Sequence, residues 1–229
     1  MSRRTLLAML AVFAALLPGR ALASDLEPPH AWPVRLVPGV VYSAQTHKLS
    51  CEAAALQMAL SHEGVNVSQD DVLALIPVDK RSPESDADGM HWGNPFTTFV
   101  GDVDGSEVDG SGYGTYFPTI AAAATTLGGN VLHAGQNVRA ADVYAAVADG
   151  HPVVAWIGYD YQPHDRADYT SFDGASIPYA GPVEHAVTVA GIGEEDVLVD
   201  DPDAGPLWID KDDFEATYLT FGRMAVILA

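Results

Sequence analysis

Apolar residues recur at helical spacing early in the chain. In the stretch after Cys51 they return every three or four residues, which is the period of one helix face. These positions are Ala55, Leu56, Ala59 and Leu60. Gly64 can adopt the left-handed backbone that commonly ends a helix, and Ser50 is a favourable N-cap residue. The pattern predicts a helix from Cys51 to about Gly64.

The same spacing predicts further helices. Ser68, followed three residues later by Asp71, resembles a capping box and begins a helix that Pro77 closes. Elsewhere, Pro118 and Gly128-Gly129 mark one helix, Gly150 ends a second, and Asp210 caps a third. These later helices are predicted over residues 116–128, 138–149 and 210–218.

Strand patterns dominate the second half of the chain. Residues 152–157 form a nearly continuous apolar run with β-branched side chains, which is typical of a central buried strand. The other predicted strands cover residues 40–42, 130–134, 185–190, 196–200, 207–209 and 224–228. A helix-rich half followed by a strand-rich half predicts an α+β fold, with N-terminal helices packed on a mainly antiparallel C-terminal sheet.

Two long segments between these elements lack periodicity. Residues 78–115 are rich in glycine, aspartate and serine, and such a segment inside a compact domain is usually functional. Residues 158–182 carry several aromatic side chains, which are suited to form the walls of a substrate site. These residues include Tyr159, Tyr161, His164 and Tyr169.

The first 23 residues have the three parts of a signal peptide. Arg3 and Arg4 form a charged start, residues 6–17 are apolar, and Ala21-Leu22-Ala23 is a small-residue cleavage site. Residues 24–229 are then expected to form a single domain. The protein is predicted to be extracytoplasmic, either secreted or in the periplasm or cell envelope, with no membrane span after cleavage. Whether export follows the general or the twin-arginine route is left open.

Composition narrows the possible partners. The chain has 31 acidic and 11 basic residues and a formal net charge of −20, which argues against nucleic acid and anionic membranes as partners. The single cysteine cannot form an internal disulfide. The chain shows neither zinc-ligand spacing nor a phosphate-binding glycine loop, so we expect no cofactor and no metal. The oligomeric state is left open.

Cys51 is the candidate nucleophile. At the start of a helix, backbone N–H groups and the helix dipole favour a thiolate. A cysteine nucleophile also needs a base and a group that orients the base. His185 begins a predicted strand, and Asp201 lies sixteen residues later at the end of the adjacent strand, so a hairpin can bring the two together. Asp200 is an alternative to Asp201, because adjacent strand residues face opposite ways.

The order Gln45, Cys51, His185 and Asp201 resembles that of the papain-like cysteine peptidases that trim double-glycine leaders in bacteriocin exporters. The chain is more similar still to the exported stand-alone relatives of these peptidases. Two segments carry that second similarity, His91-Trp92-Gly93-Asn94-Pro95 and Gly112-Tyr113-Gly114-Thr115-Tyr116. The resemblance covers the chain from about residue 36 onward.

The resemblance implies a papain-like cysteine peptidase fold and a role for each candidate residue. Cys51 would be the nucleophile, His185 the base and Asp201 the residue that orients the imidazole. Gln45 would stabilise the oxyanion with its side-chain amide, together with the Cys51 backbone N–H. Glu52 departs from the glycine that often follows the nucleophile in the leader peptidases.

Other polar residues are expected to be structural. His47, on the approach to the helix, and His151, at a helix-to-strand turn, are rival histidines. The acidic loop from Asp102 to Asp109 departs from the EF-hand spacing and is expected to be a solvated turn, with calcium binding as a hypothesis.

The leading functional hypothesis is a thiol hydrolase that cleaves peptide or amide bonds, with a peptide or protein as its substrate. Two alternatives are left open. One is a binding or scaffold domain with a catalytically retired site. The other is acyl transfer, with an amine in place of water as the acceptor.

Overall fold

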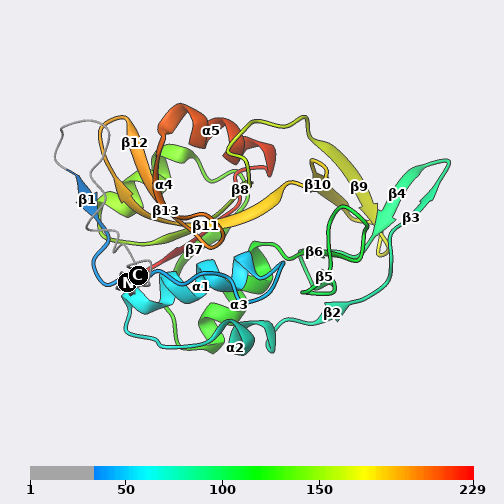
Figure 1. The fold of residues 1–229 in the computed structure, drawn as a ribbon, viewed down its shortest axis with the longest axis horizontal. Helices are drawn as coiled ribbons and strands as arrows, with labels where there is room; N and C mark the ends of the chain where they lie inside the picture. The colour runs from blue at the N-terminus through cyan, green and yellow to red at the C-terminus, as the bar shows by residue number, and fades with distance from the viewer. Residues whose placement is uncertain (1–33) are drawn as a thin grey trace, which may run out of the picture.

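A large antiparallel sheet forms the centre of the protein (Figure 1). The structure is a computed structural model that describes residues 34–229. Within these residues the sheet has seven strands in the order β13-β12-β11-β8-β14-β7, with β1 also paired to β11. The strands are β1 (Arg35–Leu36), β7 (Val131–Gly135), β8 (Val153–Gly158), β11 (Glu184–Ile192), β12 (Asp196–Asp201), β13 (Gly205–Asp210) and β14 (Ala225–Leu228). The predicted signal peptide lies outside the described residues.

Helices cover both faces of this sheet. On one face are α1 (Cys51–His62) and α3 (Phe117–Thr126), with α2 (Gln69–Leu73) beside α1 (Figure 1). On the other face are α4 (Ala140–Ala148) and α5 (Lys211–Thr220). Because side chains alternate along a strand, β8 contributes to both cores. Val154 and Trp156 pack with α1 and α3, whereas Val153, Ala155 and Ile157 pack with α4 and α5.

Helix α1 is enclosed by the rest of the molecule. It packs against β11 and α3, and its residues from Cys51 to Ala55 are all buried. A helix that is apolar on most sides fits such a central position. The fold therefore fixes the start of α1, and with it the cysteine, against the sheet.

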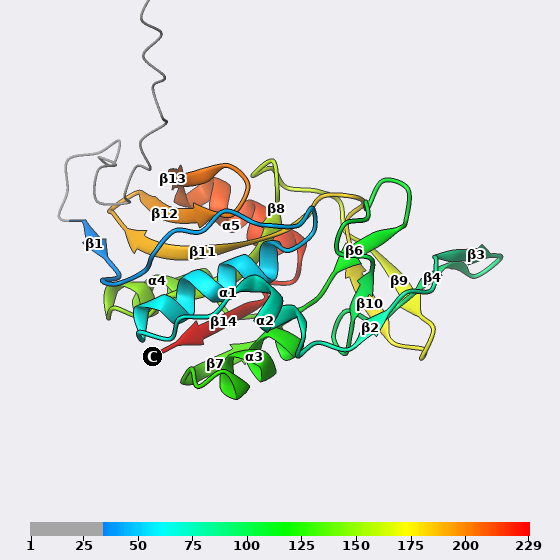
Figure 2. The same ribbon diagram turned by 60° about the horizontal axis from the view of Figure 1, so that its bottom comes forward.

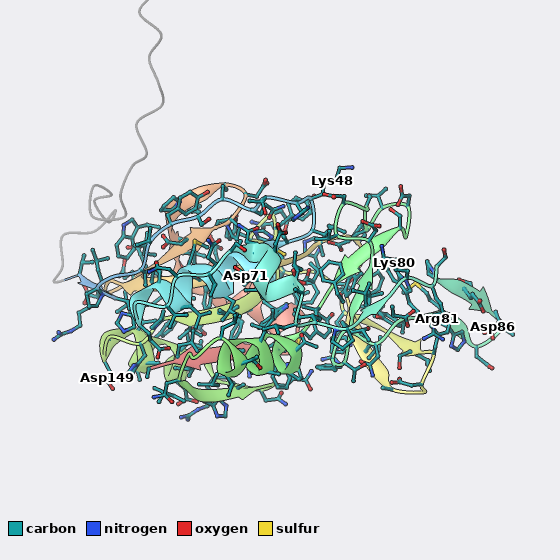
Figure 3. The ribbon with its side chains drawn as sticks, turned by 90° about the horizontal axis from the view of Figure 1, so that it is seen from below. Lys48, Asp71, Lys80, Arg81, Asp86 and Asp149 are labelled. Carbon is teal, nitrogen blue, oxygen red and sulfur yellow. The ribbon has the colours of Figure 1, made fainter. Side chains whose placement is uncertain are left out.

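The two long segments without periodicity build a lobe beside the main sheet (Figures 1 and 2). Its strands form two small sheets, ordered β10-β9-β4-β3 and β2-β5-β6. They are β2 (Val78–Asp79), β3 (Glu84–Asp86), β4 (Gly89–Trp92), β5 (Phe99–Gly101), β6 (Gly112–Gly114), β9 (Ala167–Ser171) and β10 (Ser176–Tyr179). Lys80, Arg81 and Asp86 lie on this lobe, and Asp149 lies at the opposite end of the molecule (Figure 3).

The α+β architecture predicted from the sequence is confirmed, with helices packed on an antiparallel sheet. The predicted capping box at Ser68 is present, since its hydroxyl accepts from the Asp71 N–H and its own N–H donates to the Asp71 carboxylate. None of the described helices is long and apolar enough to cross a membrane.

Three local predictions are wrong. Residues 40–42 form no strand, and the segments 78–115 and 158–182 contain short strands where loops were expected. Ser50 makes no side-chain cap on α1. Its hydroxyl instead accepts from the His47 N–H at 3.1 Å, and it donates to Gln69 Oε1 of the neighbouring α2 at 2.8 Å.

Candidate active site

Cys51 is the first residue of α1 and is only 6% exposed. Its backbone N–H is in the first helical turn, where N–H groups have no partner within the helix. The thiol donates to Glu52 Oε2 over 3.3 Å. The structure thus places the predicted nucleophile at a helix start, as expected, but buries it.

Neighbouring strands bring His185 and Asp201 together. Thr188 pairs with Asp200 in the register of β11 and β12, so the end of β12 reaches the start of β11. His185 Nε2 lies 2.9 Å from Asp201 Oδ1, and both side chains are buried. The contact that the hairpin spacing predicted is therefore present.

Three further groups hold the Asp201 carboxylate in place. The backbone N–H groups of Asp203 and Ala204 donate to Oδ1 at 2.7 and 3.0 Å, and the Tyr161 hydroxyl donates to Oδ2. Burial raises the pKa of Asp201, but hydrogen bonds with His185 and these donors outweigh it and lower the pKa to about 2. Asp201 is therefore an anion at neutral pH and can stabilise a protonated imidazole.

Asp200 has a different environment. Both of its carboxylate oxygens are buried with no hydrogen-bond partner among the described residues. It lines a separate cavity of about 290 Å³, between β12 and the segment 36–42, and burial raises its pKa to about 6. Asp201, not Asp200, contacts His185.

Gln45 lies on the wall of the same cavity as Cys51 and His185. Its Nε2 donates to the Lys48 carbonyl at 2.8 Å, which leaves the second hydrogen of the amide available. Its Oε1 is buried and has no partner among the described residues. The side chain is thus held beside the cavity, and its second N–H has no partner within residues 34–229.

The cavity that contains these groups has a volume of about 200 Å³. Its lining residues come from the approach to α1, the first residue of α1, the two long segments, the start of β11 and the turn after β12. They are Gln45, Lys48, Leu49, Cys51, Glu107, Tyr159, Glu184, His185 and Asp203. Larger cavities, of about 490 and 290 Å³, include none of Gln45, Cys51, His185 and Asp201. Only Tyr159 confirms the expectation that the aromatic residues of 158–182 form a wall of this cavity.

Three carboxyl groups gather at the site, and those of Glu52 and Glu184 lie beside the sulfur. The sequence did not predict this grouping. Glu52 and Glu184 are almost fully buried, and the Glu107 carboxylate accepts from the Glu184 backbone N–H at 3.3 Å. Burial raises the pKa of Glu52 to about 7 and that of Glu107 to about 9, and raises the pKa of Glu184 well above its ordinary value. No sequence motif points to Glu107 or Glu184, and both are distant in the sequence from Cys51 and Glu52.

These carboxyl groups also change the chemistry expected of Cys51. Burial, and then the negative charges of Glu52 and Glu184, raise the pKa of the Cys51 thiol well above its ordinary value, whereas a backbone hydrogen bond from Ala186 lowers it. The prediction of a lowered thiol pKa is therefore wrong for the protein without substrate. The helix start does not overcome burial and these two acids, so the thiol is protonated at rest.

The segment 112–116 is hydrogen-bonded to Glu52 at the site and to Trp156 in the sheet. The backbone N–H of Thr115 donates to Glu52 Oε1 at 2.5 Å, and the Thr115 carbonyl accepts from the indole of Trp156 at 3.0 Å. Trp92, in the other segment noted in the sequence, is buried and packs on Tyr113 with ring centroids 5.6 Å apart. The two segments thus connect the lobe to α1 and to β8.

Other sequence candidates lie away from this cavity. His47 Nε2 lies 2.9 Å from Asp70, and its Nδ1 faces Asp104. Neither His47 nor His151 lines the site. In the acidic loop, Asp102 binds Lys80, whereas Asp109 accepts from Ser111. Among the described residues, the carboxylates of this loop do not converge on one point.

The fold is similar to those of two solved structures. A candidate C39-like peptidase from Bacillus anthracis matches with a TM-score of 0.72 and 22% identity, over 86% of this chain and 97% of that one. The peptidase domain of Streptococcus ComA, described as a bifunctional ABC transporter involved in a quorum-sensing pathway, matches with a TM-score of 0.51 and 16% identity. That match covers 83% of this chain and 98% of the other.

The model of the Peptidase_C39 like family matches residues 37–226, and the chain belongs to this family. Its family and fold are those of a papain-like cysteine peptidase. A search of the curated proteins finds no match to the chain.

Proposed function

We propose that this protein is an extracytoplasmic thiol hydrolase that cleaves peptide or amide bonds with Cys51, His185, Asp201 and Gln45. The observation that carries the proposal is the hydrogen bond between His185 and Asp201, on the wall of the cavity that Cys51 and Gln45 also line. Membership of a peptidase family supports a peptide substrate. The signal-peptide pattern of residues 1–23 supports export.

In the proposed first step, the thiol proton moves to His185. The Nε2 atom donates its hydrogen to Asp201, so Nδ1 carries the lone pair that accepts this proton. The sulfur of Cys51 then forms a bond to the substrate carbonyl carbon. Since the resting thiol is protonated, the base is essential to this step.

The negative charge of the tetrahedral intermediate develops on the former carbonyl oxygen. The Cys51 backbone N–H and the free N–H of Gln45 would donate to it, and two such donors are the usual composition of an oxyanion hole. The imidazolium returns its proton to the leaving amine as the C–N bond breaks. Water, deprotonated by His185, then hydrolyses the thioester and restores the thiol.

The test is digestion of a peptide library, followed by mass spectrometry, with wild type and Cys51→Ala. The proposal predicts new peptide ends with the wild type and none with the variant. Cleavage that survives in Cys51→Ala would contradict the proposal. Circular dichroism and thermal melting of both proteins check that the variant is folded.

One observation favours a second candidate, a binding domain that has lost its activity. The thiol is buried and hydrogen-bonded to a carboxylate, which is unusual for a reactive cysteine. This alternative predicts that no library peptide is cleaved and that Cys51 reacts with iodoacetamide no faster than an ordinary thiol.

A further inference from the structure

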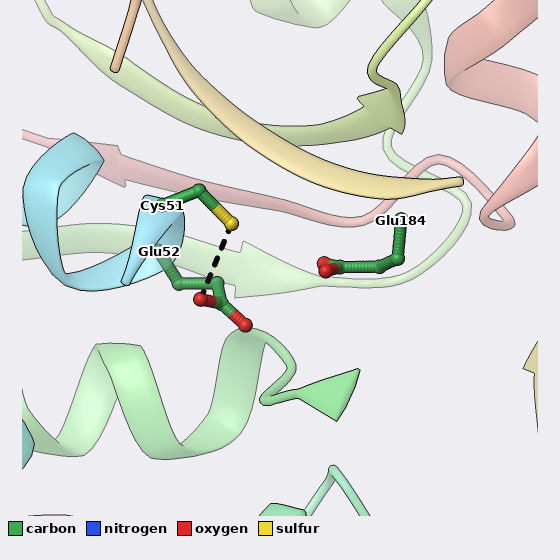
Figure 4. Close-up of side chains that lie close together, drawn as sticks. All are labelled: Cys51, Glu52 and Glu184. Atoms are coloured by element: carbon green, nitrogen blue, oxygen red, sulfur yellow. Dashed lines mark hydrogen bonds between the residues drawn. The ribbon is translucent and has the colours of Figure 1, made fainter. Parts of the chain in front are cut away.

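Two carboxylates meet the sulfur of Cys51 in a buried cluster. One ligand atom from each of Cys51, Glu52 and Glu184 lies within 4.8 Å of the other two (Figure 4). The shortest pair is the sulfur and Glu52 Oε2, at 3.3 Å. The three residues are 6%, 1% and 4% exposed. A thiol and two carboxylates therefore converge in a buried position at the edge of the cavity.

Glu184 lacks the partners that a buried carboxylate needs. Both of its oxygens are buried and accept no hydrogen bond among the described residues. Its side chain points toward Cys51 and Glu52 (Figure 4). Buried polar groups are nearly always satisfied, so one with no partner indicates a group missing from its surroundings.

Glu52 is already held in the position of a ligand. Its Oε1 accepts from the Thr115 N–H, which leaves Oε2 directed at the sulfur. Gly114 makes room for both carboxylates, since a Cβ there would lie 2.3 Å from Glu52 Oε1 and 3.2 Å from Glu184 Oε2. The backbone of the lobe is therefore shaped around this pair of acids.

We propose that Cys51, Glu52 and Glu184 form a zinc-binding site that overlaps the nucleophile. Zinc takes thiolate and carboxylate ligands, whereas calcium and magnesium prefer oxygen alone, so the sulfur selects zinc. Ligand atoms around tetrahedral zinc are roughly 3.3 to 3.7 Å apart, as follows from bonds of about 2.0 to 2.3 Å. The present spacing needs side-chain movements of about 1 Å to close on the ion.

The fourth position of the ion would face the cavity. Cys51 and Glu184 line this cavity of about 200 Å³, which offers space for a water ligand. When zinc binds, the S–H bond breaks, a Zn–S bond forms and the proton passes to solvent. Zinc would then block nucleophilic attack reversibly, and this consequence rests on the proposed hydrolase function.

The positions of the ligands also explain why no sign of a metal is visible in the sequence. Glu184 is separated from Cys51 and Glu52 by more than half the chain, so no short ligand spacing exists. The expectation of no metal rested on that spacing alone.

The direct test is titration of the purified, metal-free protein with Co²⁺, followed by competition with Zn²⁺. Cobalt replaces zinc in tetrahedral sites, and a bound thiolate adds a sulfur-to-cobalt charge-transfer band in the near ultraviolet. The proposal predicts one bound equivalent, with this band, that Zn²⁺ displaces. Absence of the band in the wild type would overturn the proposal.

Substitutions of the proposed ligands test which side chains bind the metal. Cys51→Ser should abolish the band, and Glu184→Gln should weaken metal affinity by about tenfold or more. Glu107→Gln is the matched control, because it makes the same change in the same cavity but outside the cluster. Equal weakening by Glu107→Gln and Glu184→Gln would contradict the proposed ligand set. If Glu184→Gln does not fold, Glu52→Gln takes its place in this comparison.

A second readout connects zinc to the thiol without a substrate. Zinc should protect Cys51 from iodoacetamide at the concentrations that displace cobalt, and alkylation unaffected by saturating zinc would overturn the overlap. If the protein binds cobalt but its metal-free form cleaves no peptide, the zinc site is supported and the hydrolase function is rejected. If the metal-free form cleaves peptides but the protein binds no cobalt, the hydrolase function is supported and the zinc site is rejected.

Discussion

At the residue scale, Asp200 and Asp201 show how one position along a strand decides the chemistry of a carboxylate. Asp201 binds His185, the Tyr161 hydroxyl and two backbone N–H groups, so it is held as an anion. Asp200 faces the other way and has no partner among the described residues. Tyr161 reaches Asp201 from a left-handed backbone conformation, with φ of 58°, which indicates that the surrounding structure fixes this contact.

The two aspartates give a matched pair of variants for catalysis. Asp201→Asn removes the charge that stabilises the imidazolium, and we expect peptide hydrolysis to fall by about 10²-fold to 10⁴-fold in kcat. Asp200→Asn makes the same chemical change on the other side of the strand and should leave kcat unchanged. Equal losses in both variants, measured on one peptide substrate, would contradict the assignment of Asp201.

Asp200 also predicts how stability depends on pH. Its pKa in the folded protein is raised to about 6, so above this pH the buried anion opposes folding by about 3 kcal/mol. Below about pH 4 the carboxyl is protonated in the folded and the unfolded state, and the opposition vanishes. We therefore expect Asp200→Asn to raise the free energy of unfolding at pH 7.5 and not at pH 4.

Urea unfolding of wild type and Asp200→Asn at both pH values measures this difference. The prediction fails if the variant is stabilised equally at pH 4 and pH 7.5, or if it is less stable than wild type at pH 7.5.

At the element scale, β11 and β6 organise the site. The start of β11 supplies Glu184, His185 and the backbone hydrogen bond from Ala186 to the thiol. Further along β11, the Thr188 hydroxyl donates to the Ala55 carbonyl of α1 at 2.8 Å. This strand therefore sets both the base and the helix that carries the nucleophile.

Strand β6 ends at Gly114, where only glycine fits. This residue has φ of 141°, and a Cβ would lie 2.3 Å from the Glu52 carboxylate. Gly114→Ala should lower the melting temperature and displace Glu52 from the sulfur. Gly174→Ala is the control, because Gly174 also has a positive φ, of 88°, but a Cβ there would have no other atom within 4 Å among the described residues.

The comparison separates backbone strain from crowding. Strain of this kind costs about 1 to 3 kcal/mol at either glycine. Crowding adds to it only at Gly114, so thermal melting should show a larger loss for Gly114→Ala than for Gly174→Ala. Equal losses would show that the close approach of Glu52 to Gly114 is unimportant for stability.

At the scale of the whole molecule, the sequence predicts the sheet and its helices better than it predicts the lobe. The apolar run of residues 152–157 could be assigned because a strand buried on both faces has few polar positions. The lobe depends on pairing such as that of His91 in β4 with Thr170 in β9. Such distant pairing leaves no periodic signal in a short, polar strand.

The candidate site likewise contains some residues that the sequence predicts and others that it does not. Gln45, Cys51, His185 and Asp201 could be proposed because their order resembles that of the leader peptidases, and the hairpin spacing supports the pairing of His185 with Asp201. Glu107 could not, because its position depends on how the lobe packs against the start of β11. Glu184 could not, because its place beside Cys51 depends on how α1 packs against β11. The missing side-chain cap at Ser50 could not be predicted either, because its hydroxyl accepts from the His47 N–H of the approach loop and donates to Gln69 of another helix.

The central claim is that His185 acts as the base for Cys51. The most direct test is the rate of iodoacetamide alkylation of Cys51 against pH, in metal-free wild type and His185→Ala. We expect loss of His185 to slow alkylation at pH 7 by about tenfold or more, because no imidazole remains to take the thiol proton as the sulfur reacts. Identical rate profiles in the two folded proteins would contradict it.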